Sequence, residues 1–183
     1  MDLHELTTRN DIGLVLNAMG ARLGAEIGVA FGENAEQILS TSNIQALILV
    51  DPWQYVHGED PTGYADAIKD WQGCHDYCAN KLRRFGDRAR MIRATSEEAA
   101  KAIPDGALDF IYIDGYAHTG QDGGRTLADW WPKLKPGGMF AGHDYHPRYQ
   151  PTIDVVDAFM ASRGLQFGLT EEDELPSWWT IKP

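Results

Sequence analysis

Residues 25–32 constrain the fold of this chain more than any other stretch of the sequence. They read Ala-Glu-Ile-Gly-Val-Ala-Phe-Gly, and the pattern predicts a strand over 23–27, a turn with two glycines and a helix from about 34. Glycine tolerates positive φ and lets a ligand approach the backbone. The N-terminus of a helix offers unpaired N–H groups and a partial positive charge. This stretch therefore predicts a ligand site beyond the end of the first strand.

Apolar runs and helical periodicity alternate along the rest of the chain. The expected strands cover residues 23–27, 46–50, 89–93, 108–113, 139–142, 165–169 and 177–181, and the expected helices cover about 11–19, 34–40, 75–85, 96–102, 119–134 and 153–163. This alternation predicts a single α/β domain over 1–183, with helices on both faces of the sheet. The connection between the last two strands is too short for a helical crossover, so that pair should be antiparallel.

Residues 54–74 show no clear periodicity and mix aromatic, glycine and acidic residues. Long ordered loops at the ends of strands often act as lids over a site. We therefore expect a lid loop here with a short helix inside it. Together with residues 145–152, this loop would shape a substrate pocket.

The net charge of −11 limits the partners of the chain. Binding to nucleic acid or to an anionic membrane surface needs a basic surface, so both are disfavoured. No apolar run approaches the length of a transmembrane helix, and the N-terminus lacks the pattern of a signal peptide. Cys74 and Cys78 have no second pair to complete a zinc site, so we expect two reduced thiols. These features predict a cytoplasmic protein with a small-molecule partner.

Acidic residues lie at the carboxyl ends of several expected strands, where open α/β sheets bind their ligands. Glu26 lies in the first strand, Asp51 follows the second, Asp114 follows the fourth and Asp144 follows the fifth. Aspartate after a strand is also a common turn former. The shared position of these acids at one edge nevertheless favours a site, and Asp51 is placed to accept both hydroxyls of a ribose.

The glycine turn differs from a dinucleotide-binding fingerprint. Gly28 and Gly32 are four residues apart, Ala30 takes the middle place, a third glycine is missing, and no P-loop lysine follows. The turn therefore favours a nucleoside ligand over a pyrophosphate. An NAD-dependent or other nucleoside-binding enzyme on a related sheet, or a non-catalytic binding protein, stays open as an alternative.

The order of the motifs resembles class I S-adenosylmethionine-dependent methyltransferases. Residues 26–32 resemble the glycine-rich first motif of that family, and residues 49–51 resemble the second. Residues 110–115 and 134–145, with their Lys-Pro-Gly-Gly turn, are similar to the fourth and fifth strands. The resemblance covers about residues 20–183. It implies a Rossmann-like, doubly wound sheet of seven strands, mostly parallel with an antiparallel last strand, and S-adenosylmethionine as the cofactor.

The resemblance also implies roles for residues of these motifs. The implied cofactor-binding residues are Glu26, Gly28, Phe31, Gly32, Asp51, Trp53, Ser96 and Asp114. Glu26 and the two glycines would frame the methionine portion, and Asp51 would hold the ribose with Trp53 alongside. Ser96 would lie near the adenine, and Asp114 would lie beneath the sulfonium.

Asp114 and the pair His143-Asp144 resemble the Asp…Asp-Asp arrangement of metal-dependent O-methyltransferases, which act on catechols and sugar hydroxyls. A bound cation lowers the pKa of a hydroxyl and orients its oxygen. Mg²⁺ prefers oxygen ligands, whereas two carboxylates and a histidine suit Mn²⁺, Fe²⁺ or Zn²⁺ better. The resemblance thus implies O-methylation of a small molecule, with or without a divalent cation such as Mg²⁺ or Mn²⁺ held by Asp114, His143 and Asp144.

Histidines offer a metal-free alternative. His118 lies four residues beyond Asp114, and His143 follows the fifth strand. Either side chain can act as a general base near neutral pH. The chain has no obvious substrate-capping domain, so a homodimer that closes the pocket is a further expectation.

Overall fold

The computed structural model describes residues 6–55, 67–115, 123–171 and 173–183, which form a seven-stranded sheet of order β3-β2-β1-β4-β5-β7-β6. Its strands are β1 (Leu23–Ile27), β2 (Ala46–Asp51), β3 (Ala89–Arg93), β4 (Leu108–Ile113), β5 (Leu134–Gly142), β6 (Gly168–Leu169) and β7 (Trp178–Ile181). Strands β1 to β5 pair in parallel, whereas β7 is antiparallel to both β5 and β6. The predicted sheet and its antiparallel final pair are confirmed.

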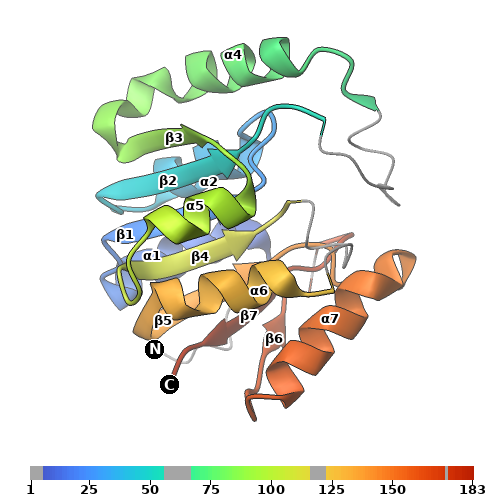
Figure 1. The fold of residues 1–183 in the computed structure, drawn as a ribbon. Coiled ribbons are helices and arrows are strands. Elements are labelled where there is room, and N and C mark those ends of the chain that lie inside the picture. The colour runs from blue at the N-terminus through green and yellow to red at the C-terminus, as the bar shows by residue number, and fades with distance from the viewer. Residues whose placement is uncertain (1–5, 56–66, 116–122, 172) are drawn as a thin grey trace.

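Helices cover both faces of this sheet (Figure 1). One face carries α1 (Ile12–Met19), α2 (Glu33–Thr41) and α4 (Trp71–Leu82), and the other carries α5 (Ser96–Ala102), α6 (Arg125–Trp130) and α7 (Gln150–Ala161). Short 3-10 segments are η1 (Arg9–Asp11), η2 (Arg83–Arg88), η4 (Trp131–Lys133) and η5 (Pro147–Tyr149). No helix in the described part of the chain is long and apolar enough to span a membrane.

Side chains of the central strands alternate between two apolar layers, as strand geometry requires. In β4, Phe110 and Tyr112 join the layer under α1 and α2, while Ile111 and Ile113 join the layer under α5 to α7. Each fully buried large side chain contributes roughly 1.5–3 kcal/mol. Glu26 of β1 pairs in register with Tyr112, so its carboxyl group is buried in the first layer.

Several boundaries differ from the expected ones because of local caps. The helix expected over 119–134 is described from Arg125, after Gly124 at a φ of 84°, and it ends in η4 before β5. Helix α4 begins at Trp71 instead of residue 75, because the Asp70 carboxylate accepts the N–H of Gly73 at 2.8 Å. Residues 71–74 are therefore helical and not part of the expected 54–74 loop, of which residues 56–66 lie outside the described residues.

The strands at the far edge of the sheet also differ in length. Strand β5 begins at Leu134 instead of residue 139, because Leu134 pairs with Leu108 across a register shift. The Lys-Pro-Gly-Gly residues therefore lie within β5 at this register shift, where Gly137 has a φ of 78° and donates its N–H to the carbonyl of Lys182. Strand β6 is shorter than the predicted 165–169 and retains only two residues.

Gly28 packs directly against the backbone that follows β4. Its φ is 86°, and an added Cβ would lie 2.3 Å from the carbonyl oxygen of Asp114 and 2.3 Å from the Cα of Gly115. Its own N–H donates to the carbonyl of Val50 at 2.9 Å. The first glycine of the turn is therefore required by the close approach of three strand ends.

We expect Gly28→Ala to destabilise the fold by about 2–5 kcal/mol, because overpacking costs about 1–3 kcal/mol and a left-handed alanine about 1–2 kcal/mol. Gly106→Ala is the matched control, since Gly106 has a φ of 64° and nothing lies within 4 Å of an added Cβ. Gly106→Ala should lose only the stability that a left-handed alanine costs, about 1–2 kcal/mol. Urea unfolding measures both variants, and equal losses would contradict the steric argument.

Candidate active site

The carboxyl ends of β1, β4 and β5 meet at one edge of the sheet, and backbone hydrogen bonds continue past the strands there. The N–H of Asp114 donates to the carbonyl of Ile27 at 2.7 Å, and the N–H of His143 donates to that of Ile113 at 3.0 Å. These bonds bring the predicted residues Asp114 and His143 together beside the glycine turn. Both residues directly follow a strand, so the sheet fixes where their backbone lies.

The Asp51 carboxylate ties two turns together. Its Oδ2 atom accepts the N–H groups of Val29 and Ala30, both at 2.9 Å, and its Oδ1 atom accepts the N–H of Trp53 at 2.7 Å. Hydrogen bonds to a charged acceptor are among the stronger ones in proteins. A carboxylate has about four acceptor positions, so three donors leave capacity for a ligand hydroxyl. The role of Asp51 at a ribose stays a prediction.

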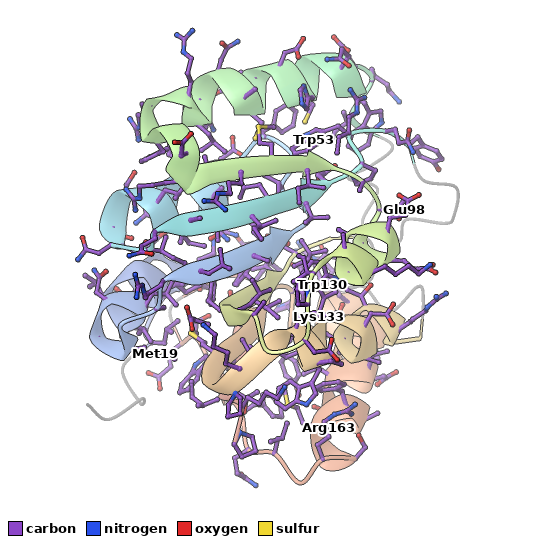
Figure 2. All side chains as sticks on the ribbon, turned by 60° about the vertical axis from the view of Figure 1, so that its left-hand side comes forward. Met19, Trp53, Glu98, Trp130, Lys133 and Arg163 are labelled. Carbon is purple, nitrogen blue, oxygen red and sulfur yellow. The ribbon has the colours of Figure 1, made fainter. Side chains whose placement is uncertain are left out.

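Trp53 closes the same corner of the molecule. Figure 2 shows it between α4 and the sheet, where its indole packs edge-on against His75 with 5.0 Å between ring centroids. The indole N–H donates to the carbonyl of Ala30 at 2.9 Å. Arg93 donates to the carbonyls of Pro52 at 3.2 Å and Trp53 at 2.9 Å. The buried tryptophan is thus a clamp between the turns after β1 and β2.

Three turns at this edge contain a non-glycine residue in the left-handed region. Ala30 has a φ of 45°, Trp53 of 40° and Asp144 of 57°. They follow β1, β2 and β5. Such conformations cost about 1–3 kcal/mol each and cluster at functional sites. The strain supports placing the site at this edge, independently of the residue types found there.

Glu26 is a buried carboxyl group with an incomplete set of partners. Its Oε1 atom accepts the side-chain N–H of Asn34 at 3.2 Å, and its Oε2 atom is buried without a hydrogen-bond partner among the described residues. Burial raises the pKa of Glu26 well above its ordinary value, and the nearby charge of Asp114 raises it further. A positively charged ligand group would relieve both effects.

His143 lies between two carboxylates. Its Nδ1 atom is 2.9 Å from Oδ1 of Asp144 and 3.5 Å from Oδ1 of Asp114. Burial lowers the pKa of His143, but the two carboxylates outweigh burial and raise that pKa to about 9. The carboxylates therefore favour a proton on Nδ1, the ring nitrogen that faces them.

Arg9 is a residue of this site that sequence reasoning missed. Its Nη1 atom lies 3.3 Å from Nε2 of His143, although the two residues are 134 positions apart. Because an arginine can only donate, this contact is a hydrogen bond only when Nε2 of His143 carries no proton. The only local signal in the sequence is the Thr8-Asp11 capping box that forms η1, and it predicts a turn without showing where the turn docks.

Phe31 and Gly32 face helix α4. The Phe31 ring packs edge-on against Tyr77 with 5.9 Å between centroids. Gly32 has a φ of 78° and caps α2, and an added Cβ would lie 2.8 Å from Sγ of Cys78. Packing against α4 thus explains the second glycine of the motif, and the cofactor contacts expected for both residues stay predictions.

Ser96 begins α5 after the third strand, as expected, but its hydroxyl faces α6. It accepts the indole N–H of Trp130 at 2.9 Å, which joins the two helices. A contact of Ser96 with an adenine stays a prediction. His118, the other candidate base, lies outside the described residues.

The predicted metal site finds no support in the arrangement of the side chains. Within the described ranges, no group of three or more His, Cys, Asp or Glu side chains is placed to hold a metal ion. A histidine ligand must present an unprotonated nitrogen to the metal. The two carboxylates favour a protonated His143, so a cation held by Asp114, His143 and Asp144 would have to compete with that proton, and the metal site stays a prediction.

The model of a methyltransferase domain family matches residues 25–145, which is more than half of the chain. The chain belongs to this methyltransferase family. The matched region contains Glu26, Gly28, Asp51 and the pair His143-Asp144, so the motifs on which the prediction depended lie inside it. The predicted methyltransferase is confirmed, and Arg9 lies outside the matched region.

Solved structures show the same fold as this methyltransferase. A candidate caffeoyl-CoA O-methyltransferase from Staphylococcus aureus superposes with a TM-score of 0.70 at 16% identity, covering 94% of this chain and 82% of its own. An O-methyltransferase from Bacillus cereus superposes with a TM-score of 0.65 at 14% identity, covering 98% of this chain and 84% of its own. TomG from Streptomyces achromogenes gives 0.65 at 11%, with coverage of 96% and 79%. A comparison with curated proteins finds no match.

We expect Asp51→Asn to destabilise this methyltransferase by about 1–3 kcal/mol, because an amide offers one acceptor oxygen and leaves a buried N–H without a partner. Asp105→Asn is the control, since Asp105 is 72% exposed and pairs with Lys133 at the surface. It should change stability by less than about 0.5 kcal/mol. Thermal and urea unfolding measure the difference, and a stable Asp51→Asn variant would show that the three amides do not depend on the carboxylate.

Proposed function

We propose that this methyltransferase uses S-adenosylmethionine to methylate a hydroxyl group of a small molecule. The observation that carries the proposal is the buried carboxyl group of Glu26, whose Oε2 atom has no hydrogen-bond partner among the described residues. It lies one residue before the end of β1, next to the glycine turn. The ammonium group of a methionine moiety supplies the positive charge and the donors that this site needs.

The residues around Glu26 fit the remaining parts of the cofactor. Gly28 lets the turn pack closely against the backbone after β4, and the clamped corner formed by Asp51 and Trp53 is the expected place of the ribose. The Bacillus cereus structure is a complex with S-adenosylhomocysteine and the TomG structure a complex with S-adenosylmethionine. Both proteins are O-methyltransferases, which supports the cofactor and the reaction proposed for this chain.

When bound, S-adenosylmethionine supplies an electrophilic methyl group on a positively charged sulfur. Alignment of the acceptor oxygen with this group would provide most of the rate. Asp114 is the carboxylate best placed to accept the hydroxyl proton, since its side chain is 21% exposed and that of Asp144 is 9% exposed. His143 holds its proton toward both, so it suits a positioning role, and His118 stays an alternative base.

The acidic charge of the chain favours a neutral or cationic small molecule over a nucleic acid as the acceptor. We infer a single-domain cytoplasmic enzyme with residues 54–70 as a candidate lid. A homodimer that closes the pocket is the expected assembly, and light scattering of the purified protein tests it.

Glu26→Gln should weaken S-adenosylhomocysteine binding by roughly 10- to 100-fold, because it removes the charge that faces the ligand ammonium. Since the pKa of Glu26 is raised in the free protein and a cation favours the carboxylate, binding by the wild type should release protons and strengthen as the pH rises. Calorimetry in buffers of different ionisation enthalpy measures this release, and it should vanish in Glu26→Gln.

Glu36→Gln is the matched control for Glu26→Gln. Glu36 lies on α2, where it pairs with Arg84 at 2.9 Å on the surface, and its loss should leave binding unchanged. The buried isostere should also make the free protein more stable at neutral pH, because the raised pKa means that an ionised Glu26 is destabilising. Tight, pH-independent binding by Glu26→Gln would contradict the proposed place of the ammonium.

Methyl transfer from labelled S-adenosylmethionine to a panel of catechols and sugars tests the reaction itself. We expect a methyl ether as the product, and Asp114→Asn should lower kcat by about 10²–10⁴-fold while S-adenosylhomocysteine still binds. An active Asp114→Asn enzyme together with an inactive His118→Ala enzyme would assign the base to His118.

A further inference from the structure

Arg9 is held in place by the far end of the chain. The carbonyl of Thr7 accepts the N–H of Glu171 at 3.0 Å, and the N–H of Arg9 donates to Oδ2 of Asp173 at 2.9 Å. Leu6, at the start of this segment, is buried in the core. The guanidinium group is therefore delivered to the site by a docked segment.

The guanidinium supplies positive charge to a site that is rich in acids. Its Nη1 atom lies 3.3 Å from Nε2 of His143. Burial lowers the pKa of Arg9, but Tyr112 and Asp114 outweigh burial and raise it above its ordinary value. The positive charge of Arg9 also lowers the pKa of Glu26, whereas burial raises that pKa. Arg9 is thus a permanent cation placed among the buried acidic groups.

Arg9 also determines which nitrogen of His143 is open. A neutral ring that accepts from Arg9 at Nε2 carries its proton on Nδ1, and the imidazolium favoured by the two carboxylates carries a proton there as well. In both forms, Nδ1 lies 2.9 Å from Asp144 and 3.5 Å from Asp114, and Nε2 lies 3.3 Å from a guanidinium. A divalent cation would meet an N–H group on one side and a like charge on the other.

We propose that Arg9 takes the place of a divalent cation in this enzyme. As a positioning residue, it balances the charge of Asp114 and Asp144 and orients His143, so that the acceptor end of the site works without a metal ion. The role of Arg9 toward the acceptor rests on the proposed O-methyltransferase function. The exclusion of the cation depends only on Arg9 and the side chains around His143.

Binding of Mn²⁺ alone to the full chain tests the proposal, by calorimetry and by the electron paramagnetic resonance signal of free Mn²⁺. The wild type should show no saturable site at millimolar Mn²⁺. Arg9→Met should gain one saturable Mn²⁺ site, because the carboxylates lose their counter-charge. Its dissociation constant should be at least about tenfold below that of any Mn²⁺ binding by the wild type. Arg9→Lys keeps the charge and should behave like the wild type. Arg125→Met removes an exposed arginine that pairs with Glu97 and is the control.

Two results would overturn the proposal. One is a wild-type Mn²⁺ site that disappears in Asp144→Asn, and the other is an Arg9→Met variant that stays folded by circular dichroism and gains no site. Addition of EDTA should leave wild-type methyl transfer unchanged. S-adenosylhomocysteine binding is measured in parallel. If the wild type does not bind it, the proposed function fails, but the comparison of Mn²⁺ binding between the wild type and Arg9→Met still tests the role of Arg9.

Discussion

The site depends on one carboxylate, that of Asp51. Its two oxygens accept three backbone N–H groups, two from the turn after β1 and one from the turn after β2. These turns contain Ala30 and Trp53, both at positive φ, so the hydrogen bonds hold conformations that a free loop would leave. The indole N–H of Trp53 and the guanidinium of Arg93 complete the clamp. The two turns are thereby held in place before any ligand arrives, which would reduce the entropy lost on binding.

A second constraint is the balance of charge on the buried side of the sheet. Glu26 and Tyr112 are neighbours in register within an apolar layer, and Asp114 follows the strand that carries Tyr112. Uncompensated negative charge is costly there, so the pKa values of both Glu26 and Tyr112 are raised. Arg9 relieves part of this charge and a cationic cofactor would relieve more. The free enzyme is therefore less stable than it could be, as expected of a site built for a charged ligand.

Much of the fold could be predicted because its signals are local. The strands at 23–27, 89–93 and 108–113 lie where the apolar runs place them, and α5 begins after the Thr95 cap. The late start of α6 could not be predicted, because the expected helical pattern continues upstream of Gly124. The clamp at Asp51 could not be predicted either, since a carboxylate after a strand can serve a turn, a ribose or three backbone amides equally well. The contact of Arg9 with His143 depends on how the chain ends dock, which no local pattern encodes.

Part of the candidate site lies outside the matched domain. The region 25–145 contains the glycine turn, the clamp and the acids of the site. Arg9 comes from before it, and the segment that holds Arg9 docks on Glu171 and Asp173 from after it. A cofactor site needs the same geometry in every member, whereas the acceptor side can change with the segments laid against it. In this chain that outer layer brings a fixed positive charge to His143 and the two carboxylates, so the acceptor meets a site whose charge is already balanced by the protein.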